Sequence, residues 1–141
     1  VGNVDGGEDN LSSYAVPAAT LSTNGDLIRF SAAGSLAGGA TTKTLKVKFG
    51  ATTILTISQV AGTAGSWTID GWVIRTGAAT QKCYAAFNTS ATGTAVASAG
   101  YTTAAETLAN SITLQFTGES TATTNDVVQE ALTVEWVPGN T

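Results

Sequence analysis

Residues 43–49 read KTLKVKF and, from the second residue on, alternate lysine or threonine with apolar residues. Successive side chains of a β-strand point to opposite faces, so this stretch separates apolar side chains from lysines. The apolar face would carry Leu45, Val47 and Phe49, and the charged face Lys46 and Lys48. Such alternation is typical of a strand that packs one face against a core. We therefore predict a strand over residues 43–49.

Similar segments recur along the chain, at 12–16, 26–30, 52–57, 67–75, 83–88, 94–98, 111–117 and 131–136. Glu130 interrupts the apolar side of the last segment, which sets its start near Ala131. The step Asp70-Gly71 predicts a bulge that redirects Trp72. Only residues 104–110 suggest a short helix. Short strands joined by turns predict an all-β fold, an antiparallel two-sheet β-sandwich, jelly-roll-like, with about eight to nine strands.

The length of 141 residues suits one domain. Residues 1–10, VGNVDGGEDN, are polar, glycine-rich and acidic. They predict a flexible N-terminal arm over 1–10 and a single β-sandwich domain over 11–141. If the arm attaches the domain to a partner, its deletion is expected to abolish attachment and to leave the melting temperature nearly unchanged.

The charge content is low, because only 11% of the residues are charged and the formal net charge is −4. Soluble domains average about 25% charged residues. The solvent-facing surface must therefore consist largely of small neutral residues, among them the 25 threonines. Such a surface suits burial against copies of the same chain. Six basic residues in an acidic chain disfavour nucleic acid, and no run approaches the ~18 apolar residues that membrane insertion requires.

The sequence offers little support for a metal site or for a nucleophilic cysteine. The chain has no histidine and one cysteine, which excludes a zinc site of the Cys/His type. Cys83 falls in an apolar strand and is expected to be a buried, inert thiol. The acidic residues Asp5, Glu8 and Asp9 lack the spacing of an EF-hand calcium loop. A solvated terminal segment is the favoured interpretation of these three carboxylates.

Two carboxylates that face each other could form the catalytic pair of a glycosidase. The candidates are five carboxylates scattered along the chain, namely Asp26, Asp70, Glu106, Glu119 and Glu135. Solvated carboxylates on strands and turns are the favoured interpretation. A Ser–Lys pair with Lys43, Lys46, Lys48 or Lys82 has no local signature. We therefore predict that the chain is not an enzyme, with no catalytic residue, no cofactor and no metal site. The ligand-binding residues stay unknown.

Two sets of side chains are candidates for functional surfaces. Lys43, Lys46 and Lys48 predict a basic stripe, which most often prevents edge-to-edge aggregation and alternatively binds phosphate or acidic glycans. The aromatic residues Trp67, Trp72, Tyr101 and Trp136 include candidates for a sugar-stacking platform. Core packing is the favoured interpretation of these residues, and it suits Trp67 and Trp136. The face of Trp72 stays unassigned because of the predicted bulge.

Several segments together resemble a group of small structural proteins of tailed-bacteriophage virions, over most of residues 14–136. They are VPAATLSTNGD (16–26), Ile28-Arg29, KTLKVKFG (43–50), Trp67, RTGA (75–78) and LTVEW (132–136). The resemblance implies jelly-roll or related β-sandwich modules, often assembled as trimers, that serve as capsid decorations, head fibres or tail-fibre segments. It brings no catalytic motif.

We therefore expect a non-enzymatic structural protein on the exterior of a tailed-phage virion, which decorates or cements the capsid as a trimer. Its expected partners are further copies of itself and the major capsid protein or another virion protein, without nucleic acid or membrane insertion. The alternative is a receptor- or carbohydrate-binding module of a head or tail fibre, with a host-surface glycan as its ligand. Sugar binding by the isolated protein favours the alternative, and binding only to assembled capsids favours the first hypothesis.

Overall fold

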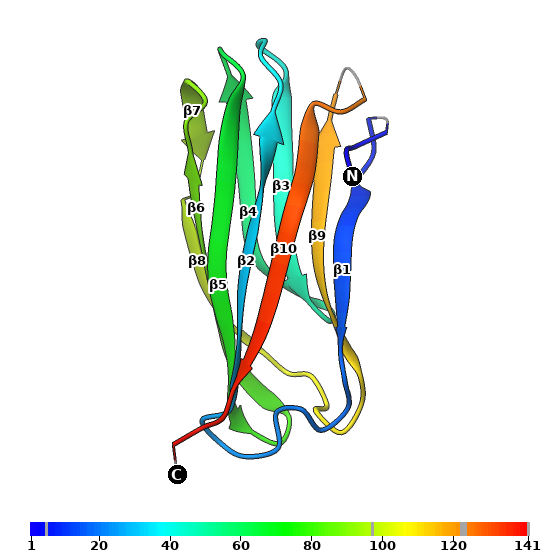
Figure 1. Ribbon diagram of the computed structural model, residues 1–141, viewed down its shortest axis with the longest axis vertical. Helices are drawn as coiled ribbons and strands as arrows, with labels where there is room; N and C mark the ends of the chain where they lie inside the picture. The colour runs from blue at the N-terminus through cyan, green and yellow to red at the C-terminus, as the bar shows by residue number, and fades with distance from the viewer. Residues whose placement is uncertain (5, 97, 122–123, 141) are drawn as a thin grey trace.

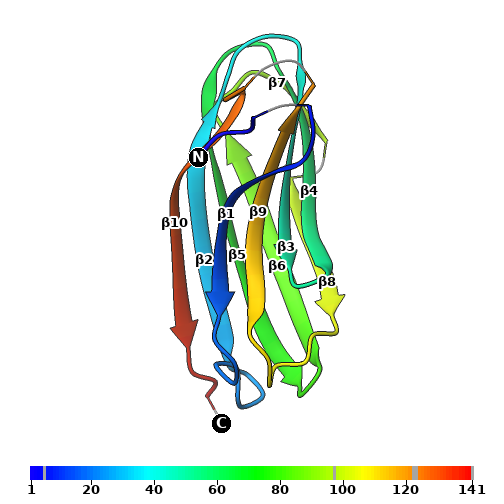
Figure 2. The same ribbon diagram turned by 90° about the vertical axis from the view of Figure 1, so that its right-hand side faces the viewer.

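The computed structural model describes residues 1–4, 6–96, 98–121 and 124–140. Its ten strands form two five-stranded antiparallel sheets packed face to face (Figure 1 and Figure 2). In spatial order, the first sheet consists of β1 (Asp9–Val16), β9 (Ile112–Ser120), β3 (Thr42–Phe49), β4 (Thr52–Ala61) and β7 (Gly93–Val96). The second consists of β10 (Val127–Val137), β2 (Leu27–Leu36), β5 (Gly65–Gly77), β6 (Thr80–Thr89) and β8 (Ala99–Ala104). The predicted all-β, jelly-roll-like antiparallel sandwich is confirmed.

The core lies between the two sheets and follows the period-two pattern of the strands. In β3, Leu45, Val47 and Phe49 face inward and are at most 2% exposed. The ring of Phe30 on β2 meets that of Phe116 on β9 edge to face, with the centroids 5.7 Å apart. Each fully buried apolar side chain of this size contributes about 1.5–3 kcal/mol through removal from water. The alternating apolar residues thus join the sheets.

The bulge predicted at Asp70-Gly71 is absent. β5 pairs with β2 and β6 without interruption through this step, and its register shift falls between Arg75 and Gly77. Gly71 occupies an ordinary inward position, where an added Cβ would lie 2.3 Å from Cζ of Phe30. Gly71 interrupts the alternation of apolar and polar residues in the sequence because it has no side chain. In the structure, the ring of Phe30 from the neighbouring strand β2 fills the space that such a side chain would occupy. Trp72 therefore points outward.

A bulge occurs instead in β10, which begins at Val127 and not near Ala131. The register with β2 shifts between Gln129 and Ala131, so the strand accommodates Glu130 as an extra residue on the exposed side. Because the bulge adds one residue, the alternation of inward and outward side chains shifts by one position at Glu130. This shift is why the sequence pattern predicted that the strand starts near Ala131. Trp136, expected in the core, is 52% exposed because it lies near the end of this edge strand.

Residues 104–110 do not form the expected helix, and the described residues contain none. Residues 99–104 form the unpredicted strand β8, and a loop follows. Gln81 is fully buried and pairs with the backbone of Glu106 through bonds of 2.9 and 3.0 Å, while Leu108 packs into the core. These tertiary contacts outweigh a weak local helix preference. Across the same described ranges, no helix suited to spanning a membrane is found.

The described residues before β1 lie against the sandwich, which differs from the expected division at residue 10. Asn3 is 1% exposed, and its backbone N–H donates to the Val127 carbonyl at 3.0 Å. Its side-chain Oδ1 accepts a bond from the Val127 N–H at 2.9 Å. β1 itself begins at Asp9. Deletion of residues 1–10 would remove these contacts, so an unchanged melting temperature is no longer expected.

The lysines of β3 do not form one stripe. Lys43 faces the interior, is fully buried and donates to the Thr41 carbonyl at 2.9 Å. Lys46 and Lys48 lie on the outer face, and both form ion pairs with Glu8. β3 is the central strand of its sheet, so these lysines do not protect an edge. Hydrogen bonds from Lys46 and Lys48 hold the pKa of Glu8 at about 2.

Replacement of Glu8 by glutamine is expected to lower the free energy of unfolding at pH 7 by at most about 1 kcal/mol, because the ion pairs are partly exposed. The folded-state pKa lies below the ordinary value of 4.5. The stabilisation is therefore complete above pH 4.5 and is lost as the pH falls through about 2. Urea unfolding of both proteins from pH 7 to pH 2 measures this, and a constant difference across that range contradicts it.

Candidate functional site: a groove on the outer face of the second sheet

A row of five side chains crosses the outer face of the second sheet. Each is the direct partner of the next on the adjacent strand, as the register of the four strand pairs shows. In spatial order they are Glu135, Arg29, Trp72, Tyr84 and Tyr101. Side chains in direct cross-strand register have Cβ atoms about 4.5–5.5 Å apart and contact one another. We call this set the large row.

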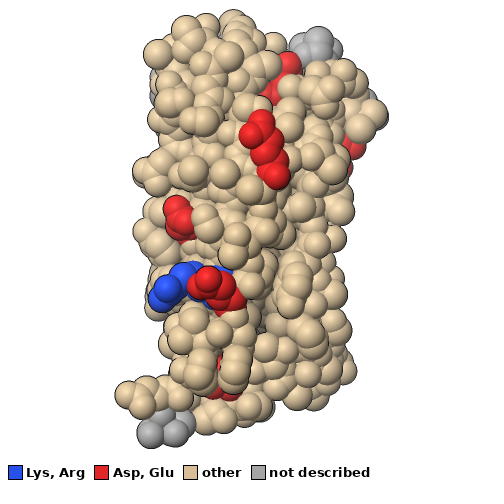
Figure 3. Space-filling model, viewed as in Figure 1, with Lys and Arg blue, Asp and Glu red and all other residues tan. Residues whose placement is uncertain are grey.

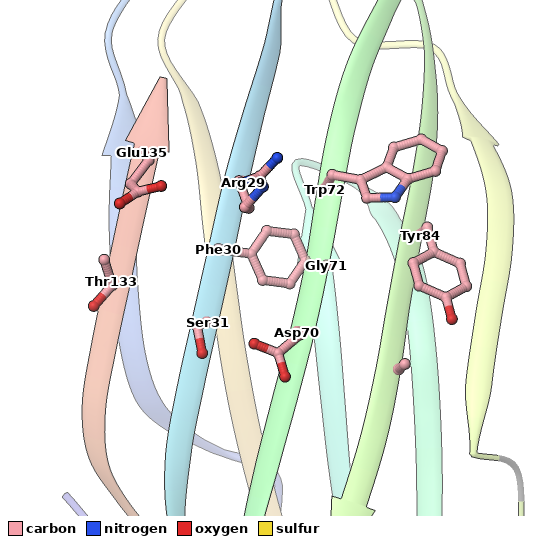
Figure 4. Close-up of a pocket in the computed structure, with 10 residues that line it drawn as sticks. Arg29, Phe30, Ser31, Asp70, Gly71, Trp72, Tyr84, Thr133 and Glu135 are labelled. Atoms are coloured by element: carbon pink, nitrogen blue, oxygen red, sulfur yellow. The ribbon is translucent and has the colours of Figure 1, made fainter. Parts of the chain in front are cut away.

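The next row of the same face carries small side chains. Its members are Thr133, Ser31, Asp70, Ala86 and Ala99. The step from large to small side chains leaves a groove of about 370 Å³, with Phe30 and Gly71 contributing to its lining. Figure 4 shows Glu135 and Thr133 on one side and Trp72 and Tyr84 on the other, with Arg29, Ser31 and Asp70 between them. The pairing register therefore creates the groove.

The aromatic side of the groove is held by ring contacts. Trp72 and Tyr84 stack with their centroids 5.8 Å apart and an interplanar angle of 25°. Tyr101 meets Trp72 edge to face at 6.2 Å, and Nζ of Lys82 lies 5.8 Å from the Tyr101 centroid. Such ring pairs contribute about 0.5–1.5 kcal/mol beyond their buried area. The half-buried indole of Trp72 is thus fixed in position before any ligand arrives.

Three charged side chains line the groove, namely the carboxylates of Asp70 and Glu135 and the guanidinium of Arg29. All three residues are exposed. Most of the face in Figure 3 carries neither acidic nor basic side chains. With one positive and two negative groups, the groove has a formal charge of −1. In the described part of the chain, no three His, Cys, Asp or Glu residues gather into a potential metal site.

Of the five carboxylates considered from the sequence, only Asp70 and Glu135 come together in the groove. Their strands are separated by β2 and their rows by two residues, which places their backbones about 12 Å apart. Glu119 lies on the other sheet, opposite Thr44. Glu106 accepts a bond from the Ala51 N–H at 2.7 Å and thereby holds the β3–β4 turn.

Asp26 has a structural role at the end of the sandwich that carries the C-terminal residues. It is 4% exposed and accepts bonds from the backbone N–H groups of Ser22, Thr23 and Gly139 at 2.8, 2.7 and 2.8 Å. Donation by Gly139, Thr23 and Ser22 lowers the pKa of this carboxyl. The side chain thus ties the chain end to the loop before β2.

The other described candidates lie outside the groove. Asp5 is not among the described residues, and Asp9 accepts a bond from the Val4 N–H at 2.6 Å. Lys82 donates to Oγ1 of Thr103 at 2.6 Å. Cys83 is fully buried as expected, and burial raises the pKa of its thiol to about 11. Trp67 packs in the core as predicted.

Arg29 and Tyr84 are site residues that sequence reasoning did not single out. Tyr84 alternates with the inward Cys83 and Ala85, so its outward orientation was readable from the pattern. Its position beside Trp72 was not readable, because strand pattern does not specify which residues face each other across strands. Treating Gly71 as an inward position would have placed Trp72 on the same face as Asp70.

The protein is thus a β-sandwich with an open groove on the outer face of its second sheet, and aromatic side chains form one side of that groove. Comparisons with protein-family models, with curated proteins and with solved structures gave no match to this chain.

Proposed function

We propose that this chain is a non-enzymatic structural module on the exterior of a tailed-phage virion, where it decorates or cements the capsid as a homotrimer. The observation that supports it is the low density of charged side chains on its outer faces. Lys46 and Lys48 are paired with Glu8 on the first sheet, and on the second sheet Asp70 is the one charged member of the row of small side chains beside the large row. Interface cores are depleted in charged residues, so such faces suit packing against other protein surfaces.

Two measurements test this proposal. Native mass spectrometry of the purified protein is expected to show a trimer. Purified phage capsids stripped of their exterior proteins are expected to bind the protein at saturable sites, detected by co-sedimentation. The proposal is contradicted if the protein is a monomer and does not co-sediment with the capsids.

A second candidate function is a receptor- or carbohydrate-binding module of a head or tail fibre. The observation that favours it is the groove, which combines a fixed indole with carboxylate and guanidinium groups. Binding is better supported than hydrolysis, because the side chains of both Asp70 and Glu135 are exposed. A glycosidase acid is normally shielded from water so that its pKa rises.

A further inference from the structure

We infer that the groove is a subsite for one pyranose ring of a neutral glycan, which stacks on the indole of Trp72 and is hydrogen-bonded by Asp70, Arg29 and Glu135. This rests on the second candidate function and specifies its ligand class. The first supporting observation is size. At about 370 Å³ the groove lies near the lower end of the 300–1,000 Å³ typical of small-molecule sites. An open groove of this size receives one ring while the rest of a chain extends beyond it.

The second observation is the stacking surface. A pyranose presents a patch of C–H groups on one face, which requires a flat apolar partner. Trp72 supplies such a partner, and its contacts with Tyr84 and Tyr101 hold the indole in place. Because the ring is already fixed, binding loses little side-chain freedom.

The third observation is the set of polar groups beside the indole. Carboxylate oxygens accept hydrogen bonds from sugar hydroxyls, and a guanidinium donates to hydroxyl or ring oxygens. Asp70 lies below Trp72 in Figure 4, and Arg29 lies between Trp72 and Glu135. Donors and acceptors thus lie on the same face as the stacking surface, as recognition of a polyhydroxylated ring requires.

The fourth observation is charge. Two carboxylates and one guanidinium line the groove, so its net charge is −1. An acidic sugar would bring a further negative charge next to Asp70 and Glu135 and would be repelled. The charge balance therefore favours neutral hexoses and N-acetylhexosamines over sialic or uronic acids.

The test begins with the full chain on an array that carries neutral oligosaccharides of glucose, galactose, mannose and N-acetylglucosamine together with sialylated and uronic-acid glycans. We expect binding to a subset of the neutral glycans and at least tenfold weaker binding to their acidic counterparts. Isothermal titration calorimetry with the best neutral glycan then gives its Kd. No binding of any neutral glycan at millimolar concentration, or a preference for acidic glycans, overturns the inference.

The substitution Trp72→Ala is expected to weaken this binding at least tenfold. Trp136→Ala is the matched control, because Trp136 is exposed but does not line the groove, and its effect is expected to stay below twofold. If Trp72→Ala does not fold, Asp70→Asn serves instead, since Asp70 is exposed, and it is expected to weaken binding several-fold. Unchanged affinity in whichever of these two groove variants is folded overturns the inference.

The inference and the proposed functions fail in different ways. Saturable capsid binding that persists in Trp72→Ala, without any glycan binding by the native chain, leaves the structural role standing and removes the sugar subsite. Binding of glycans that Trp72→Ala does not weaken retains a carbohydrate-binding function but places its site elsewhere.

Discussion

Replacement of Trp67 by alanine is expected to lower the free energy of unfolding by about 3–5 kcal/mol, the range for loss of a large aromatic core side chain. Trp67 is 1% exposed. Its Nε1 lies 3.2 Å from the Ser35 carbonyl oxygen and 3.1 Å from that of Val128, so one side chain of β5 reaches backbone groups of β2 and β10. Gly34 makes room for it, because a Cβ there would lie 2.7 Å from the indole.

The comparison that isolates burial is Trp136→Ala, since it removes the same side chain from a position that is 52% exposed. We expect this variant to lose no more than about 0.5 kcal/mol, as surface substitutions usually do. Urea unfolding followed by far-ultraviolet circular dichroism measures both variants. Equal losses at the two positions would show that Trp67 does not hold these three strands together.

The substitution Gly71→Ala is expected to lower the free energy of unfolding by at least about 2 kcal/mol, because the inward position is already full. An added Cβ would lie 2.3 Å from Cζ of Phe30 and 2.3 Å from the carbonyl oxygen of Tyr84. The Phe30 ring is held against Phe116, and the Tyr84 carbonyl belongs to the backbone of the paired strand β6. Neither can retreat without disturbing the sheet beneath Trp72.

Gly77→Ala on the same strand is the matched control. There the nearest atoms to an added Cβ belong to Thr80 at 3.5 and 3.6 Å, which is ordinary contact. We expect a change within about 0.5 kcal/mol at this position. Thermal unfolding of both variants measures the difference, and a Gly71→Ala protein as stable as Gly77→Ala would contradict the crowding at Gly71.

The strands were predictable wherever apolar and polar residues alternate without interruption. Residues 43–49 show this most clearly, and the same pattern located β9 and most of β6. Errors arose where one position departs from the pattern for a tertiary reason. Gly71 resembled a break because its space is filled by Phe30, and Glu130 resembled a strand boundary because a bulge accommodates it. Neither reason is visible in a local window of sequence.

The candidate site was predictable only in its parts. Trp72, Asp70 and Glu135 were noted for their chemistry, but they come from β5 and β10, and β2 lies between those strands. Their proximity depends on the pairing of each strand with the next, which is set by turns, bulges and core packing together. The burial of Lys43 is a similar case, because it depends on loop carbonyls at the end of the sandwich.

The antiparallel β-sandwich was predictable from the chain alone, because period-two alternation is a local property that follows from strand geometry. Its composition alone also determined that charged groups are sparse on the surface. The large row and the row of small residues beside it, in contrast, follow from the way the folded strands pair. A row across a sheet depends on register between strands distant in sequence, and register is a property of the assembled sheet.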